Sequence, residues 1–240
     1  MRDMKDAASI PLLVLLPGLD GTGKLFAHFV RMLGEDIDTQ VIAYPTDQPL
    51  GYEELEHRVR ASLPADRPFV LLGESFGGPI AMRIAASSPV GMRGLILCGT
   101  FAKNPYPLFG WASRFAWLVP VKSLPRWLRA PLMWGSKDAD RAPPQAERAI
   151  AGVAAAVVRR RIAALLTVDA SDCLELIRVP ALILYARRDR VVPFAATRWL
   201  TARMPGAEIA PIEGPHLLLQ ARPHECAPRV VQFIRNNWSP

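Results

Sequence analysis

The stretch Phe69-Val-Leu-Leu-Gly-Glu-Ser-Phe-Gly-Gly78 joins an apolar run to a glycine-rich turn, and a helix-forming segment, residues 79–86, follows it. A G-x-S-x-G pattern between a strand and a helix predicts a sharp elbow that lifts the serine, Ser75, above the carboxyl edge of a parallel sheet. Gly73 and Gly77 leave the room that such a turn needs. The stretch therefore predicts an α/β fold and a candidate nucleophile.

Similar apolar runs recur along the chain and have the character of buried parallel strands. Helix-forming segments separate them, and within Tyr52–Leu63 apolar side chains return every four residues. This alternation predicts a mostly parallel sheet of about six strands with helices on both faces. The expected strands are Pro11–Leu16, Gln40–Tyr44, Pro68–Leu72, Arg93–Cys98, Ala181–Tyr185 and Ala207–Ile212, and the expected helices are Lys24–Leu33, Tyr52–Leu63, Phe76–Ala86, Phe194–Met204 and Glu225–Asn236.

Length and composition fit one globular domain over residues 1–240, because 50% of the residues are hydrophobic and 21% are charged. No apolar run approaches the roughly 18 residues of a membrane span, so an integral membrane protein is not expected. Asp3 and Asp6 do not fit the basic start of a signal peptide. The three cysteines are too far apart for a disulfide framework, and we expect a reducing, cytoplasmic location.

Residues 100–170 interrupt the alternation of strands and helices. They contain no strand-like run but four of the six tryptophans, Trp111, Trp117, Trp127 and Trp134, and we expect a helical lid inserted into the sheet domain. They also hold 11 Lys and Arg against 4 acids, leaving 18 of the 29 basic and 18 of the 22 acidic residues elsewhere. Such a basic surface is either simply solvated or binds an acidic partner, and Arg159–Arg161 are its densest part.

A second motif, Gly18-Leu-Asp-Gly-Thr-Gly-Lys24, has the G-x-x-x-x-G-K spacing of a phosphate-binding loop. The next position of that motif supplies a hydroxyl to magnesium, and here it is Leu25. The mismatch makes nucleotide binding the weaker interpretation.

A serine nucleophile needs a base, and the base needs an orienting carboxylate. His216 lies after the last expected strand and before the final helix, whereas His224 lies at a helix start, where a capping or exposed role fits better. Asp189 follows the strand that ends at Tyr185, while Asp169 and Asp172 belong to the end of the insertion. The favoured set is therefore Ser75, Asp189 and His216, in the chain order expected on this scaffold.

Together these segments resemble the α/β-hydrolase superfamily over nearly the whole chain. The Leu16-Pro-Gly-Leu-Asp-Gly21 stretch resembles that family's oxyanion loop, and the basic, Trp-rich insertion lies where the family has its lid. The resemblance implies that the backbone N–H groups of Leu19 and Phe76 form an oxyanion hole. It also implies two-step acyl transfer without a metal or an organic cofactor.

The expected activity is hydrolysis of carboxylic esters. An acyl thioesterase or an acyltransferase would use the same residues, so these alternatives stay open. The basic insertion suggests an acidic acyl-carrier protein as partner, as in the similar pimeloyl-carrier-protein methyl esterases. Nucleic-acid binding and integral membrane contact are not expected. A hydrolase-fold binding protein without catalysis is the alternative of another class.

Overall fold

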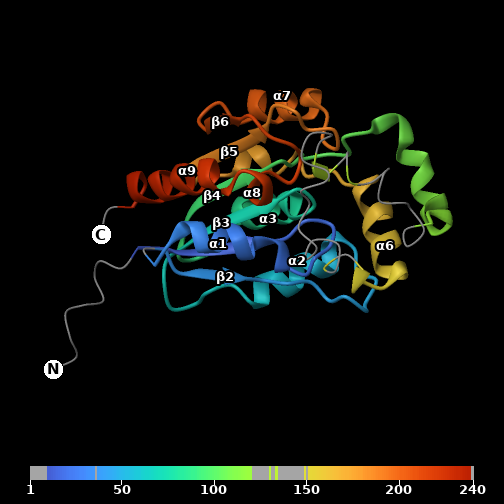
Figure 1. The fold of residues 1–240 in the computed structure, drawn as a ribbon, viewed down its shortest axis with the longest axis horizontal. Coiled ribbons are helices and arrows are strands. Elements are labelled where there is room, and N and C mark those ends of the chain that lie inside the picture. Colours follow the sequence, from blue (N-terminus) through green and yellow to red (C-terminus); the bar gives the residue numbers. More distant parts are fainter. Residues whose placement is uncertain are drawn as a thin grey trace.

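Six strands form a single sheet in which every neighbouring pair is parallel (Figure 1). The computed structural model describes residues 10–35, 37–120, 130, 133–134, 149 and 151–238. The strand order is β2-β1-β3-β4-β5-β6. The strands are β1 (Leu12–Leu16), β2 (Thr39–Val41), β3 (Phe69–Glu74), β4 (Met92–Cys98), β5 (Ala181–Ala186) and β6 (Glu208–Ile212).

Helices cover both faces of this sheet. The first face carries α2 (Tyr52–Ala61), α3 (Gly77–Ala86) and α7 (Phe194–Arg203), and the second carries α1 (Ala27–Leu33), α8 (Leu218–Ala221) and α9 (Pro223–Asn236). The 3-10 turns η1 (Lys24–Phe26) and η4 (Leu174–Leu176) complete the main body. The chain crosses from β1 to β2 in one direction along the sheet and from β2 onward in the other, so right-handed crossovers place α1 on one face and α2, α3 and α7 on the other.

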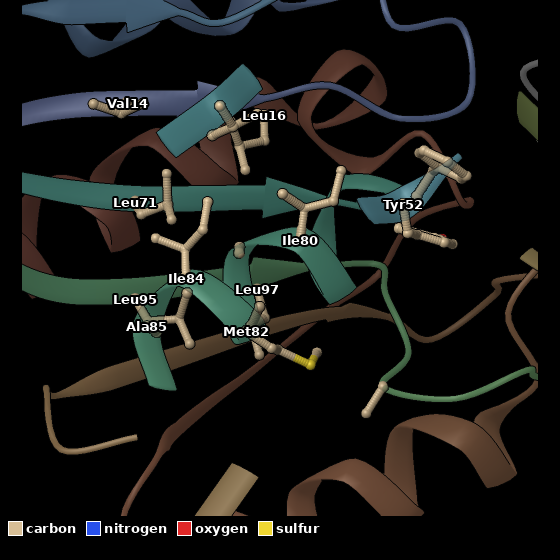
Figure 2. Packing of buried hydrophobic residues seen from close by; sticks show 14 of the residues in the cluster. Val14, Leu16, Tyr52, Leu71, Ile80, Met82, Ile84, Ala85, Leu95 and Leu97 are labelled. Carbon is tan, nitrogen blue, oxygen red and sulfur yellow. The ribbon is translucent and has the colours of Figure 1, made fainter. Parts of the chain in front are cut away.

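Alternate side chains of each strand enter two separate cores. Val14, Leu16 and Leu71 face α3, and Figure 2 shows Ile80 and Ile84 of α3 lying against these strands. The other face of the same strands packs on α1 and α9. Because the central strands are buried on both sides, their sequences read as continuous apolar runs.

The prediction of an α/β sheet of about six strands is confirmed, and the expected strands and helices of the main body are all present. Element ends differ by a few residues, most clearly at β2, which ends at Val41 rather than Tyr44. The four-residue helix α8 was not predicted, because it is too short to show helical periodicity.

The predicted insertion is described only in part. Its described helical segments are η2 (Pro107–Leu118) and α6 (Ala155–Leu165), which pack against each other beside the carboxyl ends of the strands (Figure 1). Several residues counted in the predicted insertion lie outside the described residues: Trp127 and the basic residues Lys122, Arg126, Arg129, Lys137, Arg141 and Arg148. Among the described helices, none is long and apolar enough to span a membrane.

The central strand gives a direct test of this core. Leu71 of β3 is fully buried, so Leu71→Ala leaves a cavity and should lower the free energy of unfolding by about 3 kcal/mol. Urea unfolding measures the change. The control is Leu176→Ala, because that side chain is 55% exposed. Equal effects of the two substitutions would contradict the assignment of the core.

Candidate active site

The turn between β3 and α3 holds Ser75 in a conformation that few side chains adopt. Ser75 has a φ of 48°, in the left-handed region that residues other than glycine rarely occupy. Two hydrogen bonds fix it: its N–H donates to the Cys98 carbonyl at 2.9 Å, and the Thr100 hydroxyl donates to the Ser75 carbonyl at 2.5 Å. The predicted elbow is therefore present, and Thr100 is a support that the motif alone does not show.

The glycines around Ser75 are required by close packing. A Cβ on Gly73 would come within 2.8 Å of the Gly77 carbonyl oxygen, and one on Gly77 would come within 2.7 Å of the Leu16 carbonyl oxygen. A Cβ on Gly78 would overlap the Thr100 hydroxyl at 1.9 Å. The elbow thus lies directly against the end of β1 and the start of the loop after β4.

The structure brings the three predicted side chains into one hydrogen-bonded chain. Ser75 Oγ lies 3.0 Å from His216 Nε2, and His216 Nδ1 lies 2.8 Å from Asp189 Oδ2. The His216 and Asp189 side chains are 2% and 8% exposed. They come from the loops that follow β6 and β5, so three separate strand ends converge on this point.

The second oxygen of Asp189 is held by its own loop. Oδ1 accepts hydrogen bonds from the N–H groups of Val191 and Val192 at 2.7 and 2.8 Å. Gly99 lies beside the pair with a φ of 52°, in the left-handed region that favours glycine, and a Cβ there would lie 3.3 Å from the His216 carbonyl oxygen. The carboxylate is therefore fixed on both oxygens and aimed at the imidazole.

Two backbone N–H groups in the segments next to Ser75 have no protein partner in the described chain. Within the described chain, the N–H groups of Leu19 and Phe76 donate to no other protein atom. Phe76 precedes the first turn of α3, where the helix dipole favours negative charge. Gly18 lies close to the nucleophile, since a Cβ there would be 3.6 Å from Ser75 Cβ. Both N–H groups can therefore donate to a ligand oxygen, and their role as an oxyanion hole stays a prediction.

The loop after β1 differs from a phosphate cradle. The Asp20 carboxylate accepts from the Thr22 N–H at 2.9 Å and from the Thr22 hydroxyl at 2.5 Å, which places an acid where a phosphate loop needs free donors. The Arg161 side chain lies against Gly21, where a Cβ would approach its Nη1 atom to 2.4 Å. The nucleotide-binding interpretation is therefore not supported by the geometry.

The other candidates for the base and the acid, His224, Asp169 and Asp172, are not part of the chain of hydrogen bonds to Ser75. The His224 side chain is 64% exposed and 3.7 Å from Glu225, and Asp169 bonds to Ser171. Asp172 is exposed. Among the residues that the structure describes, no three His, Cys, Asp or Glu side chains gather as a metal site would require.

The structure corrects the expectation that Arg159–Arg161 together form a basic surface. Arg161 is fully buried and belongs to the inner face of α6. Arg159 donates to the Val119 carbonyl at 3.0 Å, and Arg160 is half exposed, 4.0 Å from Glu54. Three adjacent residues cannot all face solvent on a helix that packs on one side. The acidic carrier partner stays a prediction.

The tryptophans of the insertion do not form one group. Trp111 and Trp117 of η2 are both 66% exposed, whereas Trp134 is buried and packs on Leu217, next to His216. Of these three, only Trp134 lies beside the residues of the site.

A family model for the serine aminopeptidase S33 hydrolases matches residues 53–216. This match covers more than half of the chain and includes Ser75, Asp189 and His216. The chain belongs to this family of α/β hydrolases.

Individual relatives agree with this α/β-hydrolase assignment. The "Putative carbamate hydrolase RutD" of Rhizobium rhizogenes is 29% identical, with 97% of this chain and 95% of that protein covered. The enol-lactonase of Burkholderia xenovorans has a similar fold, with a TM-score of 0.81 at 18% identity over 97% of this chain and 94% of that one. A thermophilic esterase from Thermogutta terrifontis also has a similar fold, with a TM-score of 0.74 at 19% identity. The match covers 95% of this chain and 91% of that one.

A buried carboxyl group that sequence reasoning missed lies beside the α/β-hydrolase elbow. Glu74, the last residue of β3, is 3% exposed, and the Gln220 amide donates to both of its oxygens at 2.9 and 3.2 Å. Burial raises the pKa of Glu74 to about 7; the hydrogen bond from Gln220 opposes this rise, nearby Asp20 adds to it, and nearby His216 opposes it. A polar residue at the end of an otherwise apolar strand is the signal that could have identified it.

The raised pKa predicts that stability falls as pH rises. Between the ordinary value of 4.5 and about 7, the folded protein binds a proton that the unfolded chain has lost, so the free energy of unfolding decreases over this interval. Of the decrease in the free energy of unfolding between about pH 5 and pH 8, Glu74→Gln should remove roughly 3 kcal/mol. Urea unfolding at several pH values measures it.

The matched control is Glu175→Gln, which changes an exposed carboxyl group. It should leave the pH profile of stability as in the unmodified protein. A Glu74→Gln protein with an unchanged profile would show that Glu74 titrates normally.

Proposed function

We propose that this α/β hydrolase cleaves carboxylic esters through an acyl-enzyme on Ser75. The observation that carries the proposal is the hydrogen-bonded chain from Ser75 Oγ through His216 to the doubly fixed Asp189. A serine hydroxyl is a weak nucleophile until a neighbouring base accepts its proton, and this geometry supplies that base.

The reaction would proceed in two steps. As Ser75 Oγ attacks the ester carbonyl carbon, His216 Nε2 accepts the hydroxyl proton and then gives it to the departing alcohol oxygen. Water attacks the resulting acyl-enzyme, with His216 again accepting a proton and returning it to Ser75 Oγ as the acid leaves. Asp189 would hold the imidazole with its proton on Nδ1 and stabilise the imidazolium form.

Charge that develops on the carbonyl oxygen would be bound by Leu19 and Phe76. Their N–H groups have no protein partner in the described chain; Phe76 follows Ser75 directly, and Leu19 follows Gly18, which lies close to Ser75. A donor of this kind stabilises the transition state by about 3 kcal/mol, because it is positioned before charge develops.

The names of the relatives describe one kind of chemistry. A carbamate hydrolase, an enol-lactonase and an esterase all attack a carbonyl carbon that carries an oxygen or nitrogen leaving group. A simple activated ester is therefore the first substrate to try, with a carbamate and a lactone beside it.

Ser75→Ala removes the nucleophile and should lower kcat/KM for p-nitrophenyl butyrate by about 10⁴-fold or more. Asp189→Asn should cost about 10²- to 10⁴-fold, because the imidazole then loses its preferred tautomer. Initial rates of nitrophenol release measure both effects.

The control is Ser88→Ala, an exposed serine with a similar φ of 46°. It should retain the rate of the unmodified protein. Turnover that survives Ser75→Ala would contradict the proposed nucleophile. If the unmodified protein binds p-nitrophenyl butyrate but does not hydrolyse it, the result would favour the alternative that this is a binding protein with a hydrolase fold.

A further inference from the structure

Arg161 is a buried arginine that the reaction described above does not use. It lies on α6, in the insertion, and its side chain is fully buried. Among the described residues, no carboxylate lies within salt-bridge distance of its guanidinium. A buried cation is costly unless other groups satisfy it, so its actual partners matter.

Those partners are three backbone carbonyl groups. Nη1 donates to the Leu19 and Asp20 carbonyls at 2.9 and 2.8 Å, and Nη2 donates to the Pro45 carbonyl at 2.8 Å. The guanidinium also lies 5.5 Å from the centre of the Tyr44 ring. One side chain from the insertion therefore joins the loop after β1 to the segment after β2.

The first two carbonyls belong to the loop that carries the Leu19 N–H. In the peptide between Gly18 and Leu19, the Gly18 carbonyl accepts from the Gly21 N–H at 3.0 Å. Because a trans peptide points its C=O and N–H in opposite directions, this bond turns the Leu19 N–H away from the loop interior. Arg161 fixes the next two carbonyls along the chain and so holds the same turn.

Packing adds to this attachment. The Leu19 side chain lies against a small apolar cluster that contains Val157 and Val158 of α6, and the Ala154 N–H donates to the Thr46 carbonyl at 2.9 Å. Gly21 has a φ of 71° and no space for a Cβ beside the guanidinium. The loop and α6 therefore fit together as one packed unit.

We infer that Arg161 is a positioning residue, which holds the loop after β1 so that the Leu19 N–H can bind the oxyanion. This inference rests on the proposed function and deepens it. It makes the α6 part of the insertion a fixed support of the active site rather than a cover over it. Arg161 does not touch the reacting atoms, so its effect is on the transition state through Leu19.

The test compares Arg161→Met, Arg161→Lys and Gly21→Ala with the unmodified protein. Arg161→Met should lower kcat for p-nitrophenyl butyrate by about 10²-fold, the cost of losing one oxyanion donor, with KM changed by less than about threefold. The kcat of Arg161→Lys should lie between those of Arg161→Met and the unmodified protein, because an ammonium can still reach some of the carbonyls. Gly21→Ala perturbs the same contact from the loop and should also lower kcat.

A second readout separates positioning from general structural damage. An alkyl boronic acid forms a tetrahedral adduct on a serine and places an oxygen in the oxyanion hole, so its affinity should fall by the same factor as kcat in each variant. The control is Arg60→Met, which removes an arginine that also donates to a backbone carbonyl, that of Arg83, near the far end of α3 from Ser75. It should leave kcat and boronate affinity unchanged.

The possible results are distinguishable. If kcat and boronate affinity fall no further in the Arg161 and Gly21 variants than in Arg60→Met, the inference is wrong while the proposed function stands. If Arg161→Met does not fold, Arg161→Lys and Gly21→Ala still decide between these results. If the unmodified protein shows neither Ser75-dependent turnover nor a Ser75 boronate adduct, the proposed function fails and the inference fails with it.

Discussion

The backbone strain at Ser75 is the constraint on which the rest of the site depends. A serine at a φ of 48° persists only where its surroundings fix it, and here the Cys98 carbonyl, the Thr100 hydroxyl and three close-packed glycines do so. These contacts come from the ends of neighbouring strands. The sheet order places β1 directly beside β3, so the loop after β1 lies next to the nucleophile. The chemistry thus follows from the order of the strands as much as from the motif.

Burial has different consequences for the polar side chains of the site, depending on the hydrogen bonds that each one makes. Asp189 and His216 are almost completely buried yet fully bonded to each other and to backbone N–H groups, so their orientation is fixed. Glu74 is equally buried, its carboxyl group has the Gln220 amide as its one hydrogen-bond partner among the described residues, and its pKa rises to about 7. Burial outweighs that amide hydrogen bond, so the Glu74 carboxyl group can hold a proton at a pH where an exposed glutamate is ionised.

Much of this could be predicted from sequence, for identifiable reasons. Buried parallel strands show as continuous apolar runs, and the elbow needs glycine at fixed positions. Ser75, and the loops after the strands that carry Asp189 and His216, could therefore be predicted from the sequence. Thr100 and Gln220 could not, because a single polar residue has no pattern until its neighbour in space is known. Arg161 appeared to be one of three surface arginines. Its spacing from the buried Val157 and Ala164 places it on the inner stripe of α6, and that helical phase is the signal that identifies it.

Trapping the acyl-enzyme tests the central claim most directly. The protein would be mixed with p-nitrophenyl butyrate, quenched with acid during turnover, digested, and analysed by mass spectrometry for butyrylated peptides. The structure predicts one butyryl group, located on the peptide that contains Ser75. Turnover with no adduct there, or with the butyryl group on another side chain such as that of Cys173, would contradict it.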